Sequence, residues 1–172
     1  PLSEYPAMSD DSTTWPSNGW PASQGQPNKW EGFWDGRFGK GVTYADLETY
    51  FVVNDAMDHE YINSDEYRYY PLPEKSIQPD ATFQANSPWG CVGLRIEVRG
   101  FQWNNPLVRD ALFWEYNITN ISDYNITETS FGYWVDNAIG SEGTTDDEVG
   151  YFDVLLDLSY SWDYDGVGLA GA

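Results

Sequence analysis

The segment 112–137 most constrains the fold, because two strongly alternating runs flank a short polar stretch within it. In 112–119, every second residue is apolar, which is the period of a half-buried β-strand. The alternation returns at 131–135, after a polar stretch at 120–125 that is rich in the turn-forming residues Asn, Ser and Asp. The segment therefore predicts a β-hairpin.

The period of two continues elsewhere in the chain. Residues 92–103 alternate apolar side chains with Arg95, Glu97 and Arg99, which predicts a strand with one charged, solvated side. A further short strand is expected at 49–53. Aromatic residues make up 17% of the chain against only 2 Met, and such a composition favours sheets over helices. We predict an all-β fold, an antiparallel β-sandwich of immunoglobulin-like or jelly-roll character, built around strands at 92–103, 111–119, 129–136 and 151–162.

The first thirty residues are rich in proline and tryptophan and so cannot form a regular helix or a central strand. We expect residues 1–30 to form an extended arm, and residues 31–172 to form the sandwich domain. The chain starts without a leader and stops soon after its last acidic motif, so we expect a piece of a longer protein, incomplete at its carboxy-terminal end. The tryptophans of the arm and the following loop could either stack on a polysaccharide or anchor the arm to the domain: Trp15, Trp20, Trp30 and Trp34.

The chain carries a formal net charge of −20, from 28 acidic and 8 basic residues. This charge repels phosphate backbones and anionic lipids, so neither a nucleic acid nor a membrane is an expected partner. Cations are the natural counterparts. The single cysteine, Cys91, excludes a disulfide within the chain.

Hard oxygen donors gather where the predicted strands end, which suggests Ca²⁺ binding. The Asp163-Tyr164-Asp165-Gly166 sequence has the DxDG pattern that opens many calcium loops, but an EF-hand is excluded because the chain ends before the twelfth loop position. Solvated acidic loops are the alternative interpretation. The candidate ligands are Asp136, Asn137, Asp146, Asp147, Asp153, Asp163 and Asp165.

Three N-glycosylation patterns lie within eleven residues of the hairpin segment, at Asn117, Asn120 and Asn125. They matter only if the protein passes through a eukaryotic type of secretory pathway. No nucleophile elbow, zinc-protease motif or phosphate-binding loop is present, and the lone cysteine and histidine lack a catalytic context. We therefore do not expect an enzyme.

Several long motifs carry a family resemblance: WDGRFGKGVTYADLETYFVVND, GLRIEVRGFQWNNPLVRDALFWEYNITNIS, FGYWVDNAIG, DDEVGYFDV and YSWDYDGVG. In this order they resemble a segment of large secreted proteins of Gram-negative environmental bacteria, and the resemblance covers roughly residues 10 to 168. It implies an extracellular or cell-surface location and a sheet-rich architecture rather than an activity. It also implies acidic loops that look like calcium sites, at Asp136, Asp146, Asp147, Asp153, Asp163 and Asp165. A bacterial source would remove much of the weight of the glycosylation patterns.

These observations predict an extracellular structural protein, stabilised by calcium, that is a building block of a surface layer or fibre. Its expected partners are copies of itself or other surface proteins. The alternative is a carbohydrate-binding or adhesive module of a large secreted protein.

Overall fold

The computed structural model describes residues 6–21, 30–56, 58, 62–63, 65–73, 75, 86–135 and 148–163. The chain divides into two compact units, Pro1–Thr127 and Glu128–Ala172, and each is described by itself. Strands are the main regular structure of the described residues, and their helical content is a single 3₁₀ turn, η1 (Ser12–Thr14). The all-β prediction is confirmed at this level. The sandwich arrangement stays a prediction.

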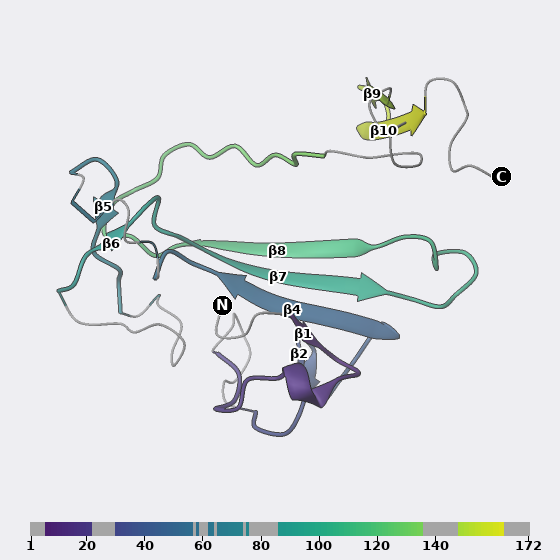
Figure 1. Cartoon of the computed structure of the whole chain (residues 1–172), viewed down its shortest axis with the longest axis horizontal. Helices are drawn as coiled ribbons and strands as arrows, with labels where there is room; N and C mark the ends of the chain where they lie inside the picture. Colours follow the sequence, from purple (N-terminus) through teal and green to yellow (C-terminus); the bar gives the residue numbers. More distant parts are fainter. Residues whose placement is uncertain are drawn as a thin grey trace. The chain divides into compact units, whose positions relative to one another are not determined.

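The first unit is organised around a 4-stranded antiparallel sheet in the order β1-β4-β7-β8. Its strands are β1 (Ala7–Met8), β4 (Leu47–Val53), β7 (Leu94–Gln102) and β8 (Phe113–Asn120). Figure 1 shows β4, β7 and β8 side by side, with β8 at one border of the sheet. The strands predicted at 49–53, 92–103 and 111–119 are confirmed within a few residues.

Two small ladders are inserted between the strands of this sheet in the sequence. β2 (Asp35–Gly36) pairs with β3 (Gly39–Lys40), so the glycine-rich segment 32–41 contains a tight hairpin. A Cβ atom at Gly36 would stand 1.7 Å from the Val42 carbonyl oxygen, so this position requires glycine. The other ladder joins β5 (Arg68–Tyr69) to β6 (Trp89–Gly90).

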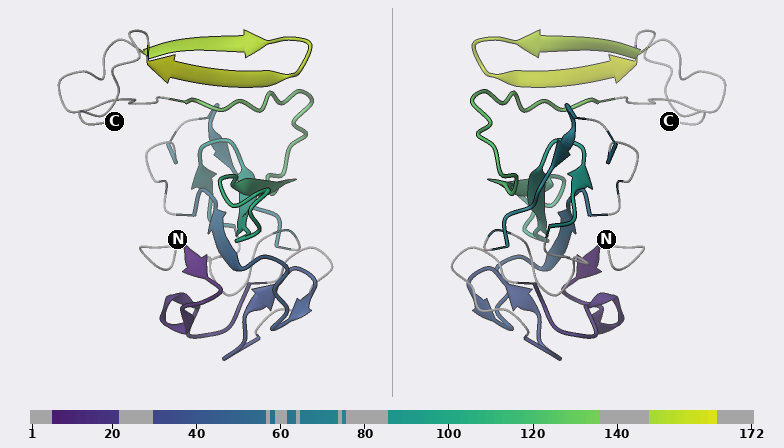
Figure 2. Two further views of the ribbon diagram at one scale, coloured as in Figure 1. Left: turned by 90° about the vertical axis from the view of Figure 1, so that its right-hand side faces the viewer. Right: turned by 90° about the vertical axis from the view of Figure 1, so that its left-hand side faces the viewer.

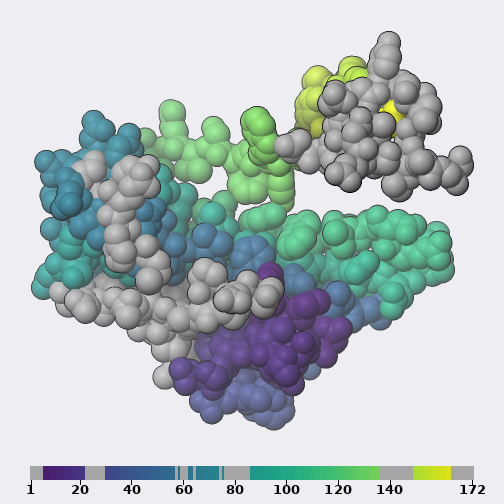
Figure 3. All heavy atoms as spheres, viewed as in Figure 1, coloured from purple at the N-terminus to yellow at the C-terminus, as the bar shows by residue number. Residues whose placement is uncertain are grey.

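Residues 6–21, the described part of the predicted extended arm, belong to the core of the first unit. Ala7 pairs with Tyr50 of β4, and Trp20 packs with Trp34 and Tyr50 in a cluster whose members are 1% to 6% exposed. In Figure 3 the amino-terminal residues (purple) pack against the loop that follows them in the sequence (blue). The predicted boundary at residue 30 therefore runs through this core. Aromatic burial holds a proline-rich segment that cannot form a regular element of its own.

A second small cluster consists of Tyr69, Trp89 and Ile121. Asp55 supports it, because its Oδ2 atom accepts a hydrogen bond from the Gly93 amide at 2.8 Å and one from the Tyr69 hydroxyl at 3.2 Å. Burial raises the pKa of the Asp55 carboxyl above its ordinary value, although these hydrogen bonds oppose the change.

The predicted hairpin over 112–137 is wrong. β8 pairs with β7, and residues 128–135 form no strand. The apolar side chains of this returning segment stay exposed, with Phe131 at 56%, Tyr133 at 62% and Trp134 at 92%. An alternating pattern shows which residues can share a face, but it does not select the partner strand. β8 is paired with β7 over the whole length of β8, from Asn120 opposite Leu94 to Phe113 opposite Phe101.

In the second unit, the segment 151–162 forms two strands where one was predicted. β9 (Glu148–Asp153) and β10 (Leu158–Asp163) make the antiparallel hairpin seen in Figure 2. Asp157 at the turn has φ 53, in the left-handed region that Asp tolerates better than most residues. The Oδ1 atom of Asp153 accepts from the Leu155 and Leu156 amides at 2.9 and 3.1 Å, which fixes the turn.

Candidate assembly surface

The main sheet buries its charged face and leaves its apolar face partly open, which is the reverse of the usual arrangement. The buried face carries Arg95, Glu97 and Arg99 from β7, which are 9%, 3% and 6% exposed. Glu48 and Tyr50 from β4 lie on the same face and are 2% and 3% exposed. The prediction that the charged side of β7 is solvated is therefore wrong. Buried charges are tolerated when they are paired or hydrogen-bonded. Each of these five residues has a hydrogen-bond partner, and Arg95, Glu97 and Arg99 also have an ion-pair partner.

Glu97 is the centre of one group on this face. Its carboxylate accepts from the Asn117 amide at 2.9 Å and from the Tyr50 hydroxyl at 3.2 Å, and it pairs with Arg95 at 3.3 Å. Arg95 also donates to the Lys75 carbonyl oxygen at 2.7 Å. Burial, and then the negative charge of Glu97, raise the pKa of the Tyr50 hydroxyl far above its ordinary value, so this hydroxyl keeps its proton as a donor.

Arg99 joins the sheet to the β2–β3 hairpin. Its guanidinium donates to the Asp35 carbonyl oxygen at 2.8 Å and meets the fully buried Asp35 carboxylate at 3.4 Å. The same guanidinium lies 4.1 Å from the centre of the Tyr50 ring, a cation–π contact. Burial raises the pKa of the Asp35 carboxyl, while the positive charge of Arg99 acts in the opposite direction.

Glu48 fastens the loop that precedes β4. One carboxylate oxygen accepts from the Trp34 indole at 2.9 Å, and the other accepts from the backbone amides of Tyr44 and Ala45 at 2.6 and 3.2 Å. The carboxylates of this face are thus structural: they hold the covering segments onto the sheet.

The opposite face of the sheet is apolar. Its central row consists of Phe51, Val98 and Tyr116, which lie side by side on β4, β7 and β8. Val98 is only 3% exposed, whereas Ile118 and Trp114 along the β8 border are 39% and 47% exposed. Single exposed apolar residues need no explanation, whereas contiguous exposed apolar groups are characteristic of interaction surfaces.

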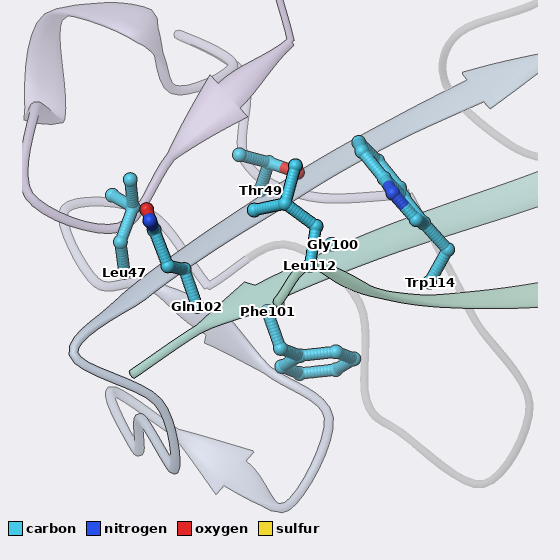
Figure 4. A pocket seen from close by; sticks show the side chains of 7 residues that line it. All are labelled: Leu47, Thr49, Gly100, Phe101, Gln102, Leu112 and Trp114. Carbon is cyan, nitrogen blue, oxygen red and sulfur yellow. The ribbon is translucent and has the colours of Figure 1, made fainter. Parts of the chain in front are cut away.

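One end of this face has a shallow hollow with about 260 Å³ of empty space, including its open mouth. Figure 4 shows Leu112 and Thr49 on one side of the sheet and Phe101 pointing to the other side. The Trp114 ring lies over Gly100, where an added Cβ atom would come within 2.8 Å of the ring. The residues that line the hollow are Leu47, Thr49, Gly100, Phe101, Gln102, Leu112 and Trp114.

The outer edge of β8 is open, since no described strand other than β7 pairs with it. Ile121 donates its amide to the Gly93 carbonyl oxygen at 2.9 Å, and this pair continues the β7–β8 register. Hydrogen-bonded and non-hydrogen-bonded pairs alternate along an antiparallel ladder. The even-numbered residues of β8, including Trp114 and Ile118, therefore direct their backbone N–H and C=O groups away from β7.

β8 lacks the features that usually protect an edge strand, which are lysine, proline, a bulge or a short length. It spans 8 residues, its register with β7 is uninterrupted, and its single charged side chain is Glu115. Glu115 is ion-paired with Arg37, so the strand is locally neutral in a chain with a net charge of −20. The opposite border, β1, is only 2 residues long.

The structure gathers the four predicted glycan-stacking tryptophans into one cluster and buries two of them. Trp20 and Trp34 are 1% and 3% exposed, and their ring centres lie 5.2 Å apart in an edge-to-face contact. Trp15 and Trp30 are partly buried against this cluster. The anchoring interpretation fits these positions. Trp20 and Trp34 have no open face on which a sugar could stack, whereas sugar binding through Trp15 and Trp30 stays a prediction.

Only two of the predicted calcium ligands, Asp153 and Asp163, fall within the described residues. Asp136, Asn137, Asp146, Asp147 and Asp165 lie outside them. Asp153 is at the turn of the β9–β10 hairpin, and Asp163 pairs with Glu148 at its other end. A strand rises about 3.3 Å per residue, so these two carboxylates are too far apart to hold one ion. Across the described ranges, no three Asp, Glu, His or Cys side chains gather as a metal site would require.

The three glycosylation patterns have different surroundings. The Asn117 amide is occupied by Glu97, and the Asn120 amide donates to the Tyr124 carbonyl oxygen at 2.8 Å. Asn120 also accepts from the Ser122 amide and hydroxyl, so it forms part of the turn after β8. Asn125 is exposed. Asn117 and Asn120 are thus poor acceptors for a glycan in the folded protein, and Asn125 is the accessible one.

Comparisons of the chain with protein-family models, with curated proteins and with solved structures found no match. Within the described ranges, the structure contains no helix with the length and apolar character needed to cross a lipid bilayer. The open edge of β8 and the buried ionic face were both missed by sequence reasoning. The sequence did hold a signal for the buried ionic face. Arg95, Glu97 and Arg99 place charges of both signs on one face of β7, and charges of both signs can neutralise one another when they are buried.

Proposed function

We propose that this chain is an extracellular structural module, a building block of a surface layer or fibre, that associates through its β-sheet. The observation that carries the proposal is the open outer edge of β8, which is long, uninterrupted and locally neutral. An exposed strand edge offers backbone donors and acceptors to another chain, and this is a common route of protein assembly. The resemblance to large secreted bacterial proteins supports the surface location.

The apolar face beside this edge supports the same proposal. Trp114 and Ile118 present apolar side chains next to the backbone groups that the edge offers, so one partner could use both. In this proposal the face is also the inner face of the predicted β-sandwich, on which a second sheet would pack about 10 Å away. Catalysis is not part of the proposal, because the Glu48 and Glu97 carboxylates accept hydrogen bonds that hold the fold together.

The proposed association requires cations, because the net charge of −20 makes copies of the chain repel one another. Calcium would then favour association, either at the acidic segments outside the described residues or by general screening. The partners would be copies of the chain or other surface proteins, with no role for nucleic acid or membrane insertion.

Analytical ultracentrifugation of the full chain at several concentrations and salt levels tests the proposal. We expect concentration-dependent association that Ile118→Lys abolishes, because lysine on an edge strand opposes strand addition. Leu107→Lys is the matched control, since Leu107 is 90% exposed in the loop before β8 and should tolerate the charge. A wild-type chain that stays monomeric at every concentration and salt level would refute the proposal.

A second candidate function, carbohydrate binding, is favoured by another set of aromatic rings. Phe38 and Tyr44 contact each other and are 50% and 61% exposed, and Trp103 donates its indole to the Tyr44 carbonyl oxygen at 2.9 Å. Exposed rings of this kind could stack on a neutral polysaccharide. Pull-down with insoluble neutral polysaccharides, compared between the wild type and Tyr44→Ala, tests this function. Equal retention of both proteins would count against it.

A further inference from the structure

We propose that the partner at the β8 edge is a second copy of this chain, paired β8 to β8 in an antiparallel register that sets Trp114 opposite Ile118 of the copy. This inference rests on the proposed function and specifies its interface. The backbone of β8 limits the possible registers, its side chains select among them, and its charge permits self-association.

The backbone limits the registers because only outward-pointing groups can pair across the new ladder. The even-numbered residues of β8 point outward, as shown by the Ile121–Gly93 hydrogen bond at the end of the β7–β8 ladder. An even-numbered residue must therefore stand opposite an even-numbered residue of the copy. The two-fold axis is then perpendicular to the sheet, and the apolar faces of both copies lie on the same side. A shift by one residue would set outward-pointing groups against inward-pointing ones.

The side chains select one register among those that remain. In one register, Tyr116 stands opposite Tyr116 of the copy, so that the two-fold axis passes between these two residues. Trp114 then stands opposite Ile118 of the copy, and Phe113 stands opposite Thr119. Aromatic residues opposite β-branched residues are among the favourable cross-strand pairs, each worth about 0.2–1 kcal/mol. Glu115 stands opposite Asn117, so no like charges face each other. A shift by two residues in one direction would set Trp114 against Asn120 and lose the first of these pairs. A shift by two in the other direction would set Glu115 against Glu115 of the copy, a like-charge pair that is destabilising.

The negative charge of the chain disfavours most contacts between two copies, but it permits a contact between two β8 edges. β8 carries a single acidic residue, and the guanidinium of Arg37 neutralises it. The repulsion between two chains of net charge −20 is long-ranged and is screened over about 8 Å at physiological ionic strength. The dimer should therefore be favoured by added salt, whereas an interface held by ion pairs would weaken.

Disulfide trapping in the full chain tests the register. Trp114→Cys and Ile118→Cys are each prepared in a Cys91→Ser background, and the chains are oxidised separately and as a mixture. Directly opposed residues have Cα atoms about 5.5 Å apart, within the range of a disulfide, whereas two copies of one variant place their cysteines about four residues apart along the strand. We expect the mixture to give at least about tenfold more covalent dimer than either variant alone. Trp114→Cys mixed with Leu107→Cys controls for random collision.

Hydrogen exchange of the unmodified chain provides a second measurement that needs no substitution. The Trp114 and Ile118 amides should exchange slowly at high protein concentration and rapidly on dilution, while the Glu115 and Asn117 amides stay protected by β7 in both conditions. Association without these two signatures would overturn the β8 register and leave the proposed function in place. A chain that is monomeric at every concentration and salt level, with no covalent dimer, would overturn both.

Discussion

The indole N–H of Trp34 donates to the carboxylate of Glu48 at 2.9 Å, and both side chains are almost completely buried. This bond joins the glycine-rich loop to the first long strand of the sheet. Trp34→Phe should lower the free energy of unfolding by about 1–3 kcal/mol, because it leaves a buried carboxylate oxygen without its donor. Urea denaturation measures the change. Trp103→Phe is the control, since its indole bond to Tyr44 is exposed, and an equal loss in both variants would contradict the prediction.

Arg99 offers a stronger test of the buried charged face. Arg99→Met should destabilise the protein by about 3–5 kcal/mol, because it leaves the fully buried Asp35 carboxylate without its counter-charge. The matched control is Arg109→Met. Arg109 and its partner Asp110 are 64% and 90% exposed and lie 3.6 Å apart, and exposed pairs of this kind contribute little. Thermal and urea unfolding of both variants give the comparison. A loss below about 1 kcal/mol at Arg99 would contradict this account of the buried face.

Asp55 should give the protein an unusual dependence on pH. Burial raises the pKa of its carboxyl, so the folded state holds this proton to a higher pH than the unfolded state does. Between the ordinary pKa of about 3.9 and the raised one, the folded state binds more protons, and the free energy of unfolding falls as the pH rises. Asp55→Asn removes this dependence, so the stability of the wild type relative to the variant should decline from about pH 4 upward.

Urea unfolding of both proteins at a series of pH values checks the Asp55 prediction. Asp65→Asn is a suitable control, because the Asp65 side chain is 92% exposed. A wild type that gains stability relative to Asp55→Asn as the pH rises would show that hydrogen bonds to the carboxylate outweigh its burial.

The sequence predicted where the strands of the main sheet lie better than it predicted which strands pair and which face is buried. Alternation located β7 and β8, because a period of two is a local property of each segment, and β4 was expected as a short strand. Alternation could not show that β8 pairs with the preceding strand β7, or that the charged face of β7 is buried. Both features depend on segments that are distant in the chain. Asp35 meets Arg99 across 64 residues, and Trp20 reaches the core from a segment with no period at all.

The effect of divalent cations separates two origins of calcium dependence. If Ca²⁺ and Mg²⁺ raise the melting temperature and the association equally, they act by screening the net charge of −20. If Ca²⁺ acts at a much lower concentration than Mg²⁺, a dedicated site is present, since calcium accepts more oxygen ligands and a looser geometry. We expect the second result. A hundredfold excess of Ca²⁺ over its Kd would then add about 2.7 kcal/mol to the free energy of unfolding.

Differential scanning calorimetry with and without a chelator measures the calcium effect. Asp147→Asn should reduce it, and Asp10→Asn, in the turn after β1, should leave it unchanged. A melting temperature that does not respond to the chelator would count against a calcium site of any kind.

The unequal borders of the main sheet limit how far assembly through it can proceed. β8 offers 8 residues to a partner, and β1 at the other border offers only 2. Once two copies have joined at β8, each has used its long border and presents only the short one, so the reaction stops at a closed pair. A fibre or layer would therefore have the pair as its repeating unit, and its growth would depend on a second, weaker contact that could be regulated on its own.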